Sequence, residues 1–197
     1  MAISSRLQAF LAQHRIPFTV KQHPLAYTAQ EIAASQHVSG KQLAKCVVAI
    51  TDSGACLAVL PAHLRVDLAK LKALVKATRL SLAKEAQTRG IFTDVQPGAM
   101  SVFGHLYNVP TIVDKSLVST ERIVCNAGSH RETVTIRYED FARHAKPRVG
   151  VFAMQVAAPK RPARRGKPGK PSSKKPRVTR AASKKPARRA KPVKKRR

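Results

Sequence analysis

The sequence predicts an α+β fold in which a mixed, partly antiparallel sheet is flanked by helices. Two observations predict it. Apolar residues recur at helical spacing in some segments, while short β-branched runs in others have the character of strands. Glycine-containing turns join neighbouring strands as hairpins. Because the hairpins mix with helices instead of alternating strictly with them, α+β is favoured over a doubly wound α/β arrangement.

Charge divides the chain into two parts. The 197 residues hold 38 Lys+Arg and 10 Asp+Glu, a formal net charge of +28. Residues 159–197 contain 19 of the basic residues and no acidic one. They lack aromatic residues, so they cannot bury enough apolar surface to offset the entropy of ordering. We expect a folded domain over 1–153 and a disordered Lys/Arg/Pro/Ala-rich tail over 154–197.

The N-terminal third begins with two capped helices. Ser4 or Ser5 can cap a helix whose inward face carries Leu7, Phe10, Leu11 and His14. Residues 16–21 have the pattern of a short strand. Thr28 and Glu31 form a capping box that opens a second helix, which we expect to end near 38–40.

The next segment, residues 43–50, is the most informative strand. Alternation places Leu43, Lys45, Val47 and Ala49 on one face and Ala44, Cys46, Val48 and Ile50 on the other. Both faces are apolar, so the strand is expected to be central and covered on both sides. Lys45 therefore projects a cation among apolar neighbours. It either reaches a cleft, partner or anionic ligand, or extends from the start of the strand into water.

The remaining elements follow in order. A turn at 51–54 leads to a second strand at 55–61, and Asp67 starts a helix. The lysines of that helix form a solvated face or a phosphate-contacting one: Lys70, Lys72 and Lys76. The other expected elements are a helix over 83–89, a loop over 97–106, strands at 111–113, 121–126 and 132–138, a glycine turn at 127–131 and a helical turn at 139–144.

Several functional classes are excluded or disfavoured. No stretch approaches the roughly 20 apolar residues of a membrane helix, and the N-terminus lacks a signal-peptide run, so a cytoplasmic protein without membrane contact is expected. The three cysteines, Cys46, Cys56 and Cys125, resemble buried small hydrophobes in a reducing compartment. We expect no metal site and no cofactor, and no Ser-His-Asp order or carboxylate pair stands out.

Three features could converge to form a site. They are Lys45, the glycine-bracketed loop 98–104 and the turn 126–130, which offers Asn126, Ser129 and His130 as hydrogen-bonding groups. Glycine loops leave backbone N–H groups free for an oxyanion or a phosphate. Each segment is also compatible with an ordinary local turn, and spacing alone does not bring them together.

Residues 1–153 resemble the YbaK/prolyl-tRNA-synthetase-associated domain family, aminoacyl-tRNA deacylases that edit in trans. Four stretches, in the order of the family, carry the resemblance, and residues 146–149 add to it. They are Tyr27-Thr28-Ala29-Gln30-Glu31, Gly40-Lys41-Gln42-Leu43-Ala44-Lys45, Gly98 to His105 and Asn126-Ala127-Gly128-Ser129-His130.

The resemblance implies an editing pocket and hydrolysis of the ester that joins a mischarged amino acid to the tRNA 3′ end, with tRNA(Pro) carrying Ala or Cys as the expected substrate. It implies catalytic roles for Lys45, Gly128 and His130. The substrate-binding residues it implies are Gly98, Ser101, Phe103, Gly104, Asn126 and Ser129. The N–H groups near Gly104 and Gly128 are expected to stabilise the developing oxyanion. Ser101 stands where the family has proline.

The basic tail predicts a second binding activity. It resembles the tails of linker histones in composition, and such cations neutralise phosphates with strong salt dependence. The residues expected to bind nucleic acid are Lys174, Lys175, Lys184, Lys185, Arg188 and Arg189. A merely solubilising tail is the alternative.

Two hypotheses therefore stand. The first is a trans-editing deacylase that binds aminoacyl-tRNA, with prolyl-tRNA synthetase as a further partner and a tail that raises affinity for tRNA. The second is a catalytically degenerate deacylase fold that acts as a nonspecific DNA- or RNA-binding, nucleoid-associated protein.

Overall fold

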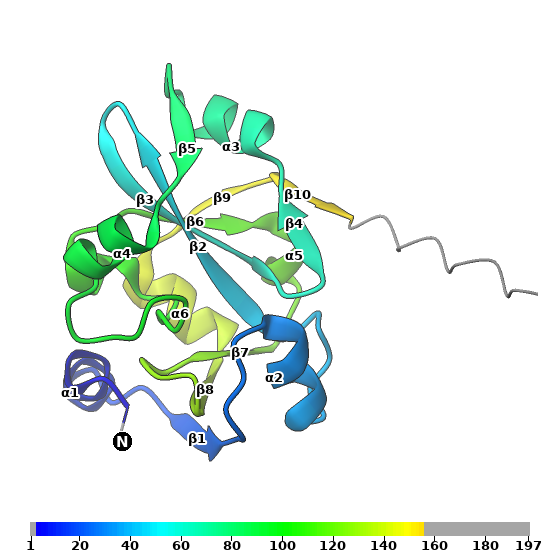
Figure 1. Ribbon diagram of the computed structural model, residues 1–197. Helices are drawn as coiled ribbons and strands as arrows, with labels where there is room; N and C mark the ends of the chain where they lie inside the picture. Colours follow the sequence, from blue (N-terminus) through cyan, green and yellow to red (C-terminus); the bar gives the residue numbers. More distant parts are fainter. Residues whose placement is uncertain (1–2, 156–197) are drawn as a thin grey trace, which may run out of the picture. The chain divides into compact units, whose positions relative to one another are not determined.

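The computed structural model describes residues 3–155 of the chain (Figure 1). Nearly all of the predicted tail lies outside the described residues, including the six predicted nucleic-acid-binding residues: Lys174, Lys175, Lys184, Lys185, Arg188 and Arg189. The last described element, β10 (Ala153–Gln155), pairs with β4 (Leu64–Val66). The folded part of the chain therefore continues through residue 155.

A five-stranded mixed sheet forms the centre of the fold. Its strand order is β5-β2-β3-β6-β9. The strands are β5 (Leu80–Leu82), β2 (Ala44–Thr51), β3 (Gly54–Pro61), β6 (Thr111–Asp114) and β9 (Arg148–Gly150). Strand β2 is antiparallel to both of its neighbours, whereas β3, β6 and β9 run parallel. This confirms the mixed, partly antiparallel sheet that the sequence predicts.

A second, antiparallel sheet has the order β1-β8-β7. Its strands are β1 (Phe18–Gln22), β8 (Glu132–Arg137) and β7 (Arg122–Asn126). Strands β7 and β8 form the hairpin expected around the glycine turn 127–131. A parallel bridge from Leu43 to Val124 connects this sheet to the start of β2.

The helices flank these sheets (Figure 1). They are α1 (Ser5–Gln13), α2 (Ala29–Ser35), α3 (Leu68–Val75), α4 (Glu85–Ile91), the 3₁₀ helix η1 (Gly104–Tyr107), α5 (Lys115–Val118) and α6 (Tyr138–Ala145). Ser4 caps α1, and Thr28 and Glu31 form the predicted capping box of α2. None of the helices in residues 3–155 has the length and apolar character needed to cross a membrane.

The two faces of β2 are both buried, as predicted. Ala44 and Val48 belong to the main core, which also holds Phe103 and Phe141. Ala49 faces a second core, beneath α3. Lys70 and Lys72 of α3 and Lys76 at its C-terminal cap are exposed, which is compatible with both the solvated and the phosphate-contacting face expected for them.

Asp114 fixes the end of the described chain to the central sheet. Its carboxylate is 3% exposed and accepts hydrogen bonds from the backbone N–H groups of Phe152 and Ala153, both at 2.8 Å, and from Ser116. Burial alone would raise the pKa of this carboxyl, but the hydrogen bonds outweigh that effect and lower the pKa below its usual value.

Replacing this carboxylate should destabilise the fold. We expect Asp114→Asn to lower the free energy of unfolding by about 2 kcal/mol, because the amide nitrogen would face N–H donors. Since the folded-state pKa is depressed, the wild-type contribution is present above the unfolded pKa and is lost as pH falls through the folded pKa. Urea unfolding of both proteins at pH 7 and at pH 3 checks this. A difference that is the same at both pH values would contradict the assignment.

Candidate active site

The site lies where the two sheets diverge. Leu43 bridges Val124 in parallel, and Val124 N–H donates to Gln42 O at 2.9 Å. On the same edge, β2 pairs with β5 only from Ala49 to Thr51. Between these two contacts, residues 45–47 of β2 form ladder pairs only with β3. The unpaired stretch of the strand edge borders a hollow.

This hollow has a volume of about 160 Å³. A 150 Å³ cavity in another protein holds a benzene-sized guest, so the hollow suits a small side chain. Its wall combines apolar side chains with polar groups, among them Lys45 and Asn126. The lining residues are Tyr27, Ala29, Ile32, Leu43, Ala44, Lys45, Cys46, Gly98 and Asn126.

Lys45 is the cation of this hollow. The residue is half-buried, and its Nζ donates a hydrogen bond to Ala62 O at 3.3 Å. Burial, and to a lesser extent the charge of Arg65, lowers the pKa of Lys45. Within residues 3–155, none of the ion pairs involves this lysine. An ammonium has three donors, so Lys45 retains capacity for an acceptor in the hollow.

Cys46 lines the hollow next to Lys45, and its thiol and its backbone N–H have different surroundings. Its thiol donates to Ser101 O at 3.3 Å, and burial raises the pKa of the thiol well above its usual value, so it stays protonated at neutral pH. The backbone alternates along β2. Since Val48 O points away from β3 to accept from Ala83 N–H, the N–H of Cys46 points the same way, toward the hollow.

The two glycine bends predicted from the sequence lie against each other. Residues 96–99 form a type II turn, with Ala99 N–H donating to Gln96 O at 2.9 Å and Gly98 at φ +87°. Gln96 N–H donates to Gly128 O at 2.9 Å, and Gly128 N–H donates to Ala99 O at 3.0 Å. This reciprocal pair joins the loop to the β7–β8 turn.

Two side chains of the β7–β8 turn hold the same loop. Asn126 Nδ2 donates to Gly98 O at 3.1 Å. His130 Nε2 lies 2.9 Å from Pro97 O, and because a carbonyl only accepts, this nitrogen carries the proton. The buried Nδ1 of His130 then presents a lone pair, without a partner in residues 3–155. His130 therefore positions the loop.

The N-terminus of α1 supports Gly128 from behind. Ser4 N–H donates to Ala127 O at 2.8 Å, and the Ser4 hydroxyl donates to Asp94, which also accepts from the Tyr107 hydroxyl. Gly128 has φ +109°, and a Cβ placed on it would lie 2.8 Å from Ser4 Cβ. Only glycine fits this position without strain.

The structure brings together three of the residues predicted for the site and separates others. Lys45, Gly98 and Asn126 line one hollow. The N–H groups expected to face an oxyanion have other acceptors: Gly104 donates to Thr111 Oγ1 and Val102 O, and Gly128 donates to Ala99 O. These two amides are therefore not free, because tertiary contacts satisfy them.

The other predicted substrate-binding residues lie around the hollow, outside its lining. Phe103 is fully buried, packed against Phe10 and Phe141. Ser101 is buried and meets the site through its carbonyl, which accepts from Cys46. Ser129 lines a separate hollow with Arg131.

Part of the lining is not predicted by the candidate site residues of the sequence. Tyr27, Ala29 and Ile32 come from α2 and the segment before it, and the backbone of Cys46 comes from β2. The stretch that contains Tyr27 and Ala29 was available as a family motif. The free edge of β2 carries no local signal, because it depends on which strands pair with it.

Comparisons with known proteins give a family match. A family model of the aminoacyl-tRNA editing domain matches residues 23–144 of the chain. This range contains Lys45, both glycine bends and every residue that lines the hollow. No curated protein matches the chain.

Solved structures share the fold. A candidate trans-editing enzyme for prolyl-tRNA synthetase matches with a TM-score of 0.68 and 22% identity, covering 77% of this chain and 96% of that one. The hypothetical protein APE2540 matches with a TM-score of 0.70 and 15% identity, covering 76% of this chain and 100% of that one. A structure from work on epitope grafting onto scaffold proteins matches with a TM-score of 0.69 and 20% identity, covering 78% of this chain and 97% of that one.

The packing of Gly128 against Ser4 gives a prediction with a matched control. Gly54 has a similar φ of +119°, but a Cβ there would meet nothing within 4 Å. Gly54→Ala should therefore cost only backbone strain, about 1–2 kcal/mol. Gly128→Ala should cost about 1–3 kcal/mol more, because it also forces Ser4 to move. Urea unfolding measures both changes, and equal losses would show that the contact with Ser4 does not constrain the bend.

Proposed function

The chain belongs to the aminoacyl-tRNA editing domain family, and on that premise we propose that it is a deacylase acting in trans on mischarged tRNA. It would hydrolyse the ester between the amino acid and the terminal ribose. The observation that carries the proposal is the placement of Lys45: a half-buried residue whose side chain lines a small hollow together with Gly98 and Asn126.

The electrostatics of the hollow suit ester hydrolysis. Attack of water on the ester carbonyl places negative charge on its oxygen, and preorganised donors stabilise that charge. The donors we assign to this role are the Lys45 ammonium and the Cys46 N–H, which border the hollow from adjacent positions of β2. Arg65 lies near enough to lower the pKa of Lys45, and it adds positive charge for a phosphate of the tRNA end.

Among residues 3–155, those that line the hollow include no carboxylate and no imidazole. The Cys46 thiol remains protonated and is therefore a poor nucleophile. We infer that the chain supplies charge and position, and that the vicinal ribose hydroxyl of the substrate orients the attacking water. His130 would contribute by holding Pro97 and thus the Gly98 turn.

The size of the hollow favours a small amino acid. A volume of about 160 Å³ lined by Ala29, Ile32 and Ala44 accepts the side chain of alanine or cysteine. We propose tRNA(Pro) carrying Ala or Cys as the substrate, with prolyl-tRNA synthetase as its source. The fold shared with a candidate trans-editing enzyme for that synthetase supports this choice.

Removing the Lys45 cation should abolish most of the activity. We expect Lys45→Ala to lower the single-turnover rate on Ala-tRNA(Pro) by about 10²-fold or more, the scale of losing one transition-state donor. Lys41→Ala is the matched control, because it removes the same charge from an exposed position four residues away and should retain the wild-type rate.

The assay is release of labelled amino acid from Ala-tRNA(Pro), Cys-tRNA(Pro) and Ser-tRNA. Equal inactivity of the wild type and Lys45→Ala on every mischarged tRNA would overturn the enzyme proposal. The nucleic-acid-binding hypothesis would then replace it.

We further propose that the basic segment 156–197 increases affinity for tRNA without taking part in hydrolysis. Truncation after Gln155, the end of β10, should leave the single-turnover rate at saturating enzyme unchanged. It should also flatten the plot of log K against log salt for tRNA binding, because each lost phosphate contact removes about 0.7–0.9 from the slope. Filter binding from 50 to 300 mM KCl measures this, and an unchanged slope would refute the role of the tail.

A further inference from the structure

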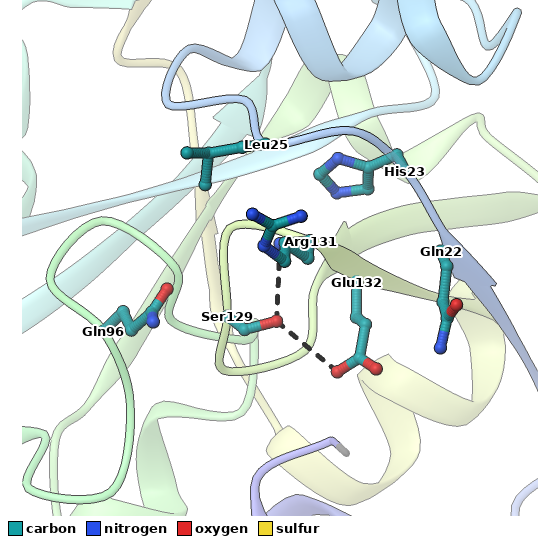
Figure 2. Close-up of a pocket in the computed structure, with 7 residues that line it drawn as sticks. All are labelled: Gln22, His23, Leu25, Gln96, Ser129, Arg131 and Glu132. Carbon is teal, nitrogen blue, oxygen red and sulfur yellow. Dashed lines mark hydrogen bonds between the residues drawn. The ribbon is translucent and has the colours of Figure 1, made fainter. Parts of the chain in front are cut away.

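Two larger hollows lie next to the one that contains Lys45. The first, of about 370 Å³, is lined by Leu25, Tyr27, Glu85, Gln96, Pro97 and His130. The second, of about 360 Å³, is lined by Gln22, His23, Leu25, Gln96, Ser129, Arg131 and Glu132 (Figure 2). Tyr27 belongs to the walls of both the Lys45 hollow and the first, and Leu25 and Gln96 are shared by the first and the second. The three hollows are therefore neighbours on the surface, and we refer to the series as the path.

The path is short enough for consecutive nucleotides of one strand to occupy its neighbouring hollows. Leu25 borders its far end and Tyr27 borders the Lys45 hollow. The Cα atoms of these residues, two positions apart, lie at most about 7 Å from each other. The segment is fixed in place, because His23 N–H donates to Arg131 O at 2.8 Å and Ala26 N–H donates to His130 O at 3.2 Å.

The far hollow contains buried acceptors. His23 is 7% exposed, and its Nδ1 lies 2.7 Å from Pro24 O, so Nδ1 carries the proton and Nε2 presents a lone pair. That buried Nε2 has no partner among residues 3–155. Glu132 is 4% exposed, and its carboxylate accepts a long hydrogen bond of 3.4 Å from the Ser129 hydroxyl. Both groups suit a ligand that donates hydrogen bonds, such as an amino group.

Donors and a cation complete the wall. The Gln96 Oε1 accepts from His130 N–H at 3.0 Å, which leaves the amide nitrogen of Gln96 as the donor of that side chain. Arg131 is exposed at the rim, and Figure 2 shows its guanidinium between Leu25 and Ser129. Acceptors and donors on one wall, with a guanidinium beside them, match the edge of an aminated nucleobase attached to a phosphate.

An exposed platform borders the path. Tyr27 is 68% exposed and Leu25 is 48% exposed, although both have large apolar side chains. The Tyr27 ring lies 4.8 Å from the His130 ring, centroid to centroid. Exposed aromatic rings beside a basic groove are the surfaces on which single-stranded bases stack.

We propose that the far hollow is a subsite for a cytosine of the tRNA 3′ end, upstream of the terminal adenosine that carries the ester. The inference rests on the proposed function, because it takes the aminoacyl end to occupy the Lys45 hollow. Glu132 and His23 accept from the cytosine amino group, Gln96 donates to the base, and Arg131 pairs with the adjoining phosphate. Sequence-independent contacts of the tail cannot supply this preference.

The test is binding of the trinucleotides CCA and UUA to the full chain by isothermal titration calorimetry. Uracil has a carbonyl where cytosine has an amino group, so the wild type should bind CCA about tenfold more tightly. Any contribution of the tail is common to both ligands. Glu132→Gln introduces an amide that also donates, so it should reduce the ratio of the two dissociation constants to near one.

Glu121→Gln is the matched control, because it removes one negative charge from an exposed side chain outside the three hollows and should keep the tenfold ratio. Thermal unfolding of each variant verifies that the fold is retained. His23→Phe, which keeps the ring but removes its lone pair, provides an independent second variant. Equal affinity of the wild type for CCA and UUA, or a preference that survives both Glu132→Gln and His23→Phe, would overturn the proposal.

A kinetic measurement separates this inference from the proposed function. The wild type and Glu132→Gln are compared on Ala-tRNA and on alanyl-adenosine, which lacks the upstream nucleotides. We expect the KM of Glu132→Gln for Ala-tRNA to be about tenfold above that of the wild type. For alanyl-adenosine, the KM values of the two proteins should be nearly equal. If the wild type hydrolyses these esters but binds CCA and UUA equally, the subsite is rejected and the enzyme proposal stands. A cytosine preference without hydrolysis of either ester would reject the enzyme.

Discussion

One parallel bridge, from Leu43 to Val124, joins the edge of β2 to β7, and the site depends on what happens just beyond it. The strands separate after this contact, and β2 regains a neighbour on that edge only at Ala49. The gap leaves a strand edge unpaired and a hollow beside it. Lys45 stands at this point of the chain, where its ammonium is only partly withdrawn from water. A continuous ladder at these residues would have removed both the hollow and the free backbone donors.

The opposite wall is rigid because two bends hold each other. The backbone pair between Gln96 and Gly128, together with Asn126 and His130, leaves the 96–99 turn few alternatives. Ser4, at the start of α1, supports the rear of Gly128. Within residues 3–155, the polar side chains of these bends position the wall, and Lys45 is the charged residue that lines the hollow. This arrangement suits a reaction whose remaining participants belong to the substrate.

Much of the fold can be predicted from patterns of residues that lie close together in the sequence. The capping box at Thr28, the two apolar faces of 43–50 and the β7–β8 hairpin each depend on residues close together in sequence, and the structure confirms them. The three-residue strands β4, β5, β9 and β10 were not predicted, because segments so short are defined by their partners. The hydrogen bonds of Gly104 and Gly128 could not be predicted for a similar reason. The sequence indicates the two bends, but residues outside each bend provide acceptors for their N–H groups.

We propose that the Lys45 ammonium contacts the ester end of a charged tRNA while the amino-acid side chain occupies the adjoining hollow. The most direct measurement is a crystal structure of the chain bound to adenosine that carries alanine through a stable 3′-amide. We expect Lys45 Nζ to lie within hydrogen-bond distance of the amide carbonyl or the adjoining ribose, with the alanine methyl group against Ile32 and Ala44. An analogue bound elsewhere, or bound with Lys45 turned to solvent, would contradict it.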